Sequence, residues 1–438
     1  MFPLTQLVLI GFGAVCKSFI TLVFKVSPHL LSVPILVIEP KSLDTSEIYN
    51  ELKKRSQLTH LQLKLERSNH NEIFESYIQD HALVVELAWR IDTDSLVKHC
   101  QRKSCLFINT ALDNWKHNDK ALVEEGHQIM KKEKGTSTAV LNSGCNPGLS
   151  SSLVKKLLDN LDPSTKRSHS EKARHLGLTT IQISERDNQV THLLSREQCF
   201  YNTWSVVGLI DEALLPARFS FGTHEKNKPF GATMVTKKPH QIELQSKCNH
   251  TRVKGYEPAG GDYVGTLIEH AEAYSLAEYL RSSDGRYSPS VYYSYLINDT
   301  GKLACWYMDY CLNKDLLPNE EHVLRSDEII SGYDSCGVLC FFKKQGKLKL
   351  YWAGSILSNE EAKQHSPEVN ATALQVGIHV LATCEWMLMN PEEGVIEPES
   401  LDSDYIIDFC RPYLGKLVWC EVTDQTIIKT DQFTELQI

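Results

Sequence analysis

The fold is decided by the stretch Leu7-Val8-Leu9-Ile10-Gly11-Phe12-Gly13-Ala14-Val15-Cys16. An apolar run that breaks into Gly-x-Gly is typical of the first strand and turn of a dinucleotide-binding βαβ unit. Gly11 suits the tight turn out of the strand, and Gly13 lets the backbone approach a pyrophosphate at the N-terminus of the next helix. Cys16 stands where such units carry a third glycine, so the motif is incomplete. A buried strand followed by an ordinary helix is the alternative interpretation.

A second apolar run, residues 34–38, ends in Glu39. A carboxylate at this place accepts hydrogen bonds from an adenosine ribose and disfavours the 2′-phosphate of NADP. The sequence therefore predicts NAD as the cofactor. The candidate cofactor contacts are Gly11, Phe12, Gly13, Ala14, Val15, Glu39, Thr110 and Asn146.

Strands and helices are predicted to alternate over the first third of the chain, which indicates an α/β fold with a Rossmann-like, doubly wound parallel sheet. The expected strands are 7–11, 34–38, 81–87, 106–108 and 138–141, and the expected helices are 14–24, 47–56 and one that starts at Asp92. We expect an NAD-binding domain over 1–147. Residues 148–438, where glycines interrupt shorter strands, are predicted to form an α+β domain for substrate binding and dimerisation.

Three segments in or near the second region carry further expectations. Asn146 and Pro147 suit the N-cap and first position of a helix, although the Asn146 carboxamide could instead face the nicotinamide end of the cleft. Residues 163–173 are polar enough for an exposed linker. The amphipathic segment 370–390, with Asn370 as its cap, predicts a helix that serves a dimer interface or packs back on the first domain.

Composition narrows the class of protein. The 438 residues carry 46 basic and 55 acidic side chains, a formal charge of −9 that disfavours nucleic-acid binding and is compatible with cationic substrates. The 13 cysteines lack zinc-type spacing, so we expect reduced thiols and no metal site. Lys17 interrupts the apolar start, and no uninterrupted apolar span follows. A cytoplasmic protein without a membrane segment is therefore expected.

Carboxylates gather near an indole in the second region. Glu185 and Asp187 precede Trp204, which is followed by the pair Asp211-Glu212 and then by the segment 269–272. Such a set suits an alkylammonium, which gains from ion pairs at its ends and from cation–π contact over the ring. A core role for Trp204 and a solvated turn at 185–187 are the alternatives. Because hydrolase, phosphate-loop and zinc-protease motifs are absent from the sequence, hydride chemistry is favoured.

An ordered set of short motifs spans nearly the whole chain. It comprises Gly11-Phe12-Gly13, Asp92-Thr93-Asp94-Ser95-Leu96, Asn146-Pro147-Gly148, Glu185-Arg186-Asp187, Asn202-Thr203-Trp204-Ser205-Val206, His270-Ala271-Glu272, Tyr351-Trp352-Ala353-Gly354-Ser355, Asn370-Ala371-Thr372-Ala373-Leu374-Gln375-Val376 and Pro412-Tyr413-Leu414-Gly415. In content and order, this set resembles bacterial homospermidine synthase, a family with saccharopine-dehydrogenase-like architecture.

The resemblance implies a dimeric NAD-dependent enzyme that joins two putrescine molecules into homospermidine and ammonia, with spermidine as a further candidate donor. It implies hydride abstraction, imine exchange and re-reduction, so that NAD is recycled. The catalytic residues implied are His270, Glu185, Glu212, Trp204 and Asn146, and the substrate-binding residues are Asp92, Asp113, Trp204, Glu212 and Glu272. Carboxylates would hold the distal ammonium, and a carboxylate or imidazole would take a proton from the reacting amine.

The chain also departs from the family pattern. Asp113 and Val207 stand where glutamates are expected, and Cys16 replaces a glycine. Two other functions therefore stay open. One is an NAD(P) oxidoreductase of the saccharopine or carboxynorspermidine type, and the other is a non-catalytic, NAD-containing polyamine-binding paralogue.

Overall fold

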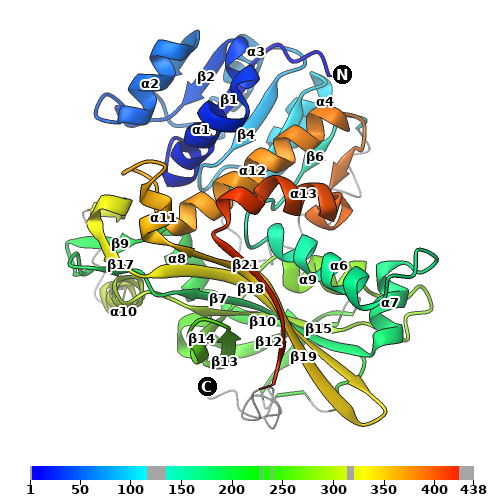
Figure 1. Ribbon diagram of the computed structural model, residues 1–438. Helices are drawn as coiled ribbons and strands as arrows, with labels where there is room; N and C mark the ends of the chain where they lie inside the picture. Colours follow the sequence, from blue (N-terminus) through cyan, green and yellow to red (C-terminus); the bar gives the residue numbers. More distant parts are fainter. Residues whose placement is uncertain are drawn as a thin grey trace.

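The computed structural model describes residues 2–115, 135–226, 228–229, 231–237, 240–312 and 320–423. Two large β-sheets lie one above the other, with helices packed between them (Figure 1). Residues 7–140 build most of the upper sheet, and residues 178–422 build the lower one. The space between the two sheets therefore lies between these two parts of the chain.

The upper sheet has seven strands in the order β20-β6-β5-β4-β1-β2-β3, and every pair is parallel. The strands are β1 (Leu7–Ile10), β2 (Ile35–Ile38), β3 (Leu58–Leu61), β4 (Leu83–Glu86), β5 (Leu106–Asn109), β6 (Ala139–Val140) and β20 (Val395–Ile396). Six of them follow the 3-2-1-4-5-6 order of dinucleotide-binding folds. The predicted parallel α/β architecture is confirmed. Strands β3 and β20 were not anticipated from the sequence.

Both faces of the upper sheet are covered, because side chains of a strand alternate between its faces. Leu7 and Leu9 join the core beneath α1 (Ala14–Val26) and α2 (Glu47–Arg55). Val8 and Ile10 join the opposite core, beneath α3 (His70–Tyr77) and α4 (Thr93–Arg102). This arrangement is the doubly wound fold that the apolar runs predict.

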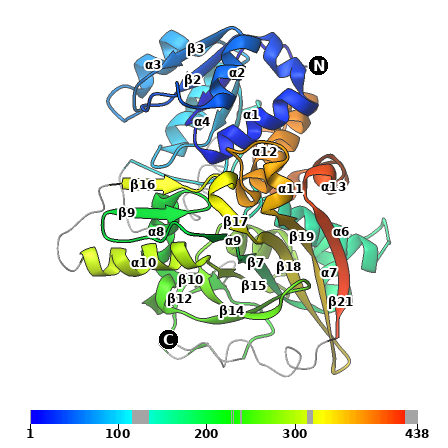
Figure 2. The same cartoon turned by 60° about the vertical axis from the view of Figure 1, so that its left-hand side comes forward.

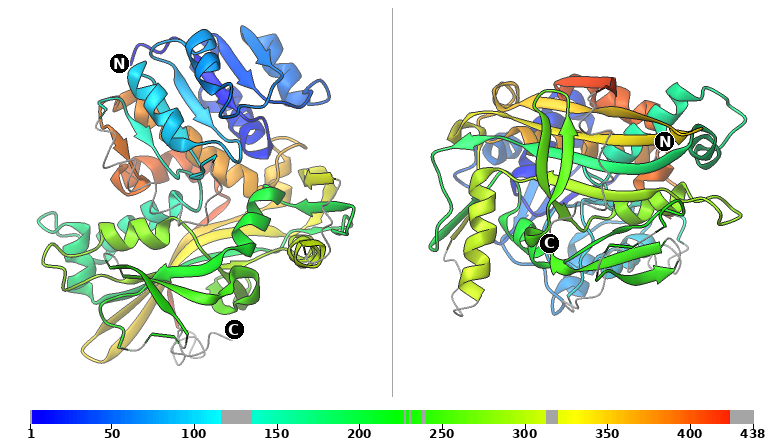
Figure 3. Two further views of the ribbon diagram at one scale, coloured as in Figure 1. Left: turned by 180° about the vertical axis from the view of Figure 1, so that it is seen from behind. Right: turned by 90° about the horizontal axis from the view of Figure 1, so that it is seen from below.

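The lower sheet has ten strands and is mixed. Its main path runs β11-β12-β10-β15-β7-β18-β19-β21, and β14 joins β13 to β15. The strands are β7 (Leu178–Asp187), β10 (Pro216–Ser220), β11 (Thr233–Lys237), β12 (His240–Lys247), β13 (Val253–Glu257), β14 (Gly261–Ile268), β15 (Ser290–Leu296), β18 (Tyr333–Lys344), β19 (Lys347–Ser358) and β21 (Lys416–Val422). From below, the β13–β14 hairpin lies across the sheet against β7 and β18 (Figure 3).

Two small ribbons and several helices complete the part of the chain that follows residue 148. The ribbons pair β9 (Cys199–Asn202) with β16 (Glu320–Val323), and β8 (Val190–Thr191) with β17 (Ile329–Ser331). The helices are α6 (Leu149–Leu161), α7 (His169–Leu176), α8 (Val206–Leu214), α9 (Glu272–Tyr279), α10 (Asp299–Leu312), α11 (Asn359–Lys363), α12 (Ala371–Met389) and α13 (Ser403–Cys410). Figure 2 shows the β9–β16 ribbon and α8 beneath the upper sheet.

Helix α12 lies between the two sheets. Asn370 caps it by accepting from the Ala373 N–H at 2.9 Å, as predicted. The helix packs against α1 and against β5, β18 and β19. A Cβ at Gly377 would lie 2.3 Å from the Ser18 hydroxyl, so the glycine permits this close approach. Helix α12 and strand β20 come late in the chain but pack with the upper sheet. The expected division into domains at residue 147 stays a prediction.

Two local expectations were wrong. Helix α6 begins at Leu149, so Asn146 and Pro147 precede it and Gly148, with φ of 128°, holds the cap position. The predicted linker 163–173 contains the start of α7, where Ser168 and Glu171 form a capping box. In both cases local polarity was misread, because the same residue types serve turns, caps and sites.

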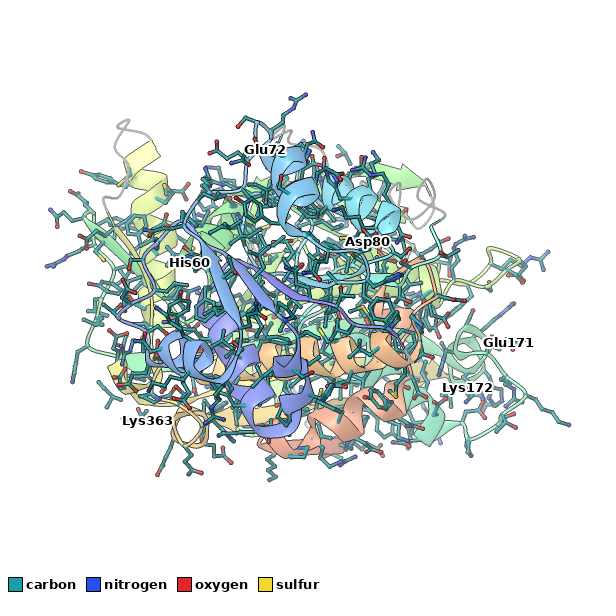
Figure 4. All side chains as sticks on the ribbon, turned by 90° about the horizontal axis from the view of Figure 1, so that it is seen from above. His60, Glu72, Asp80, Glu171, Lys172 and Lys363 are labelled. Carbon is teal, nitrogen blue, oxygen red and sulfur yellow. The ribbon has the colours of Figure 1, made fainter. Side chains whose placement is uncertain are left out.

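Nearly all the cysteines lie in the core, and many charged side chains lie at the surface. All 13 cysteines are free, and only Cys420 is more than marginally exposed. Charged side chains such as Glu72, Glu171 and Lys363 project from the periphery (Figure 4). Across the described residues, none of the helices combines the length and apolar character that crossing a bilayer requires.

Candidate active site

A cavity of about 660 Å³ lies between the upper sheet and the lower sheet. Its upper wall is formed by the turns that follow β1, β4 and β5, which end at Ile10, Glu86 and Asn109. Its floor comes from the lower sheet and from α8. Ligands of open α/β sheets bind outside the carboxyl ends of the strands, so the cavity occupies the expected place.

The glycine-rich turn forms one end of this cavity. Gly11 has φ of 86°, and a Cβ there would lie 3.0 Å from Ala88, so the position requires glycine. Nothing lies within 4 Å of a Cβ built on Gly13, which leaves open space above the turn. Gly13, Ala14 and Val15 line the cavity, as does Thr110.

Helix α1 presents its N-terminus to this open space. Gly13 occupies the N-cap position without a side-chain hydrogen bond, and the first turn carries no acidic residue. The backbone N–H groups of this turn are therefore available to an anion, which the helix dipole also favours. At the end of β2, Glu39 accepts from the Phe12 N–H at 3.0 Å and from the Lys41 N–H at 3.0 Å. The residues present fit a dinucleotide.

The floor is built around Glu185 on β7. One carboxylate oxygen, Oε2, accepts from the Asn146 amide at 2.6 Å and from the Tyr293 hydroxyl at 2.6 Å. The Cys336 thiol donates to Asn146 Oδ1 at 3.0 Å. Burial raises the pKa of Glu185, while the bond from Tyr293 opposes the rise. Asn146 thus faces the cleft, which was the second interpretation of this residue.

His270 lies between β14 and α9, beside this network. Its Nδ1 pairs with Glu272 Oε2 at 2.5 Å, and its ring centroid lies 4.5 Å from that of Tyr293. Burial lowers the pKa of His270, but the charges of Glu272 and other carboxylates outweigh it and raise the pKa to about 9. The imidazole is therefore a proton-exchanging group held in an acidic, water-poor environment.

The side wall combines Trp204, Glu212 and Asp113, all of which line the cavity. Trp204 precedes α8 and donates its indole N–H to the Tyr295 hydroxyl at 3.0 Å, so the ring is partly buried but still borders the space. Burial raises the pKa of Glu212 to about 7. An indole face beside carboxylates provides what an alkylammonium requires.

Some predicted site residues lie outside the cavity lining. Asp92 caps α4 by accepting from the Ser95 N–H at 2.9 Å, which is the helix start that its neighbours also predict. Glu272 is fully buried behind His270, and Glu39 lies behind the glycine-rich turn. Gly11 and Phe12 shape that turn without lining the space. Their predicted contacts with substrate or cofactor therefore stay predictions.

Several cavity residues were missed by sequence reasoning. Tyr293 reaches Glu185 because β15 and β7 are parallel neighbours, a pairing that no local motif reveals. Asp334 on β18 is buried, which raises the pKa of its carboxyl well above the usual range. Arg218 lies between Glu243 and Glu269, with its Nε donating to Glu243 at 2.6 Å. In the sequence, the only indication for Asp334 was that a carboxylate stands two residues before the apolar run 336–342.

No group of three or more His, Cys, Asp or Glu side chains within the described ranges is arranged to hold a metal ion. The acidic side chains of the floor come from three separate segments, namely β7, α8 and the residues just before α9. Glu185 accepts hydrogen bonds from Asn146 and Tyr293, and Glu272 pairs with His270, so part of this set is already engaged. The arrangement is suited to organic cations and proton transfer.

Comparisons with known proteins agree with this geometry. Residues 7–140 match the saccharopine dehydrogenase NADP binding domain, and residues 144–421 match the saccharopine dehydrogenase C-terminal domain. A crystal structure of homospermidine synthase from Legionella pneumophila in complex with NAD is 29% identical, with a TM-score of 0.84 over 99% of this chain and 98% of that one.

Two curated relatives extend the match. The homospermidine synthase of Mesorhizobium japonicum is 30% identical over 93% of this chain and 88% of its own length. That of Blastochloris viridis is 30% identical over 94% of this chain and 90% of its own. Both alignments run through nearly the entire chain, as the ordered motifs do. The chain therefore belongs to the homospermidine synthase family.

Proposed function

We propose that the protein is a homospermidine synthase, which joins two putrescine molecules into homospermidine and releases ammonia, with NAD as its cofactor. The observation that carries this proposal is a single cavity that runs from the N-terminus of α1 to a floor of buried carboxylates beside Trp204. A dinucleotide and a diamine can meet in such a space. Family membership supports the same reaction.

NAD fits the upper end through several features of this chain. The open space above Gly13 and the uncapped start of α1 suit its pyrophosphate. Glu39, at the end of β2, suits a ribose hydroxyl and repels a 2′-phosphate, so we expect NAD to be preferred over NADP. When bound, NAD supplies an acceptor and donor of hydride.

The diamine fits the lower end. Glu212, Asp113 and Trp204 border the cavity and would hold the ammonium that does not react. At the other nitrogen, an amine must lose a proton before its α-carbon becomes oxidised. His270 and Glu185 are the groups placed for that transfer, because both are buried, line the cavity and are fixed by hydrogen bonds.

Other features of the proposal concern the assembly and its setting. We expect a homodimer, spermidine as an alternative donor, and a cytoplasmic protein without a nucleic-acid partner. The acidic composition supports the absence of a nucleic-acid partner. The free thiols support the cytoplasmic setting. Light scattering on the purified protein tests the dimer, and replacing putrescine by spermidine in the assay tests the donor.

Product analysis tests the reaction. Purified protein is freed of nucleotide and supplied with putrescine, with NAD present or omitted. Homospermidine and ammonia in equal amounts, formed only with NAD and without net accumulation of reduced nicotinamide, are expected. Steady accumulation of reduced nicotinamide would instead indicate a simple oxidoreductase. Tight binding of NAD and putrescine without any product would indicate a non-catalytic paralogue.

A further inference from the structure

Three consecutive serines near the start of α6 are all fully buried, yet they have different surroundings. The Ser150 hydroxyl donates to Glu272 Oε1 at 3.0 Å. The Ser151 hydroxyl donates to Glu399 Oε1 at 2.8 Å. The Ser152 hydroxyl has no hydrogen-bond partner among the described residues. Only one of the three serines therefore contacts the network around the cavity.

Glu272 connects Ser150 to the imidazole. Its side chain is fully buried, and its two oxygens are divided between two partners: Oε1 accepts from Ser150, and Oε2 pairs with His270 Nδ1 at 2.5 Å. Two contacts on opposite oxygens fix the rotation of the carboxylate plane. With only one contact, the carboxylate could rotate about its terminal bond, because that torsion is broad.

We propose that Ser150 is a positioning residue for His270, acting through Glu272, an inference that rests on the proposed function. Ser150 holds Glu272, and Glu272 accepts from His270 Nδ1. The imidazole ring then keeps a fixed orientation, with Nε2 left for proton exchange with the substrate amine. The serine follows directly from the turn that carries Asn146, so one turn and helix start organise both sides of the floor.

Other groups also act on His270, and they limit how far its pKa can fall when Glu272 moves. Glu212 faces it from α8, Glu185 from β7 and the Tyr293 ring from β15, while Glu269 is its neighbour in the chain. Glu272 has the largest charge effect on the imidazole, after burial. If Glu272 turns away, the pKa of His270 falls from about 9 but stays above the value that burial alone would give.

The test compares Ser150→Ala with Ser151→Ala, its matched neighbour. We expect Ser150→Ala to lower kcat roughly tenfold, with KM changed by less than about twofold, because a misoriented proton-transfer group costs part of the factor that general acid–base catalysis supplies. The pKa of His270, followed by NMR of labelled histidine, falls in this variant. Ser151→Ala leaves both quantities near those of the unchanged protein. Ser150→Cys, which keeps the size but donates weakly, falls between the two.

A double-mutant cycle separates positioning from general stability. In a Glu272→Gln background, Ser150→Ala should have little further effect on kcat, since both changes break the same link. Additive losses, or equal effects of Ser150→Ala and Ser151→Ala on kcat and on the His270 titration, would overturn the proposal. Should Ser150→Ala fail to fold, Ser150→Cys and Ser151→Cys give the same comparison. If the unchanged protein makes no homospermidine, the proposed function fails, whereas the titration still decides the link between Ser150 and His270.

Discussion

The floor and the mouth of the cavity both carry charged groups, but in different surroundings. At the floor, Glu185 and Glu272 are buried and hydrogen-bonded. At the mouth, Arg90 pairs with Asp211 at 3.1 Å, with side chains 49% and 38% exposed, and the Trp89 indole donates to the same carboxylate at 2.9 Å. Water screens the pair at the mouth, whereas the floor lies in a medium of lower effective dielectric. Equal charges should therefore have unequal effects on activity.

The largest effect is expected from Glu185→Gln. This change keeps the size of the side chain and removes the negative charge that Asn146 and Tyr293 hold in place. Because one group in proton transfer contributes about 10²–10⁴-fold, we expect kcat/KM to fall by roughly 10²–10³. Steady-state kinetics measures the loss, with unchanged NAD binding as the control. A loss below about tenfold would remove Glu185 from the proton-transfer machinery.

Glu212 gives the next effect, and its sign follows from its pKa. Burial raises the pKa of this carboxyl to about 7, so the charge that we propose holds an ammonium is present above pH 7 and is lost as the pH falls through 7. We expect KM for putrescine to rise about thirtyfold on the acid side, which corresponds to ~2 kcal/mol for a charge-assisted bond. The KM–pH profile of Glu212→Gln should be flat over the same range. A profile that keeps its acid rise in this variant would assign the titration to another group.

Trp204→Ala should weaken diamine binding by roughly 1–2 kcal/mol if the indole face meets an ammonium. Calorimetric titration with putrescine measures this, and Trp204→Phe, which keeps a ring but loses the bond to Tyr295, is the matched control. A variant that unfolds more readily while its kinetics stay normal would mean that the ring serves the core.

The upper half of the molecule was the more predictable one. Its strands are apolar on both faces, so continuous runs such as residues 7–10 and 35–38 identify them directly. Gly11 then fixes the turn at the cofactor end, because few other residues allow its φ of 86°, and Gly13 leaves the space above that turn open. Strand β3 was not predicted because it lies at the edge of the sheet and has no fully buried residue: Thr59 is exposed and the other three are half-buried.

The floor was predictable in its members but not in their connections. Asn146, Glu185 and His270 were all identified from the sequence, yet Glu185 is bound by two residues that are distant in sequence, Asn146 and Tyr293. Tyr293 reaches Glu185 only through the pairing of β15 with β7. Such register depends on long-range packing, which short motifs do not encode. Asp92 shows a different limit, since a capping residue and a substrate carboxylate look alike in sequence: the structure shows the cap, and the substrate contact stays a prediction.

The smallest effect is expected at the mouth. Arg90→Ala removes a half-exposed ion pair that connects the turn after β4 to Asp211 on α8. Exposed pairs contribute about 0.2–1 kcal/mol, so the free energy of unfolding in urea should fall by less than about 1 kcal/mol, and the difference should shrink in high salt. Trp89→Phe is the control for the uncharged contact to the same carboxylate. If Arg90→Ala instead costs as much activity as Glu185→Gln at any salt concentration, the mouth belongs to the catalytic machinery and the contrast between the two regions fails.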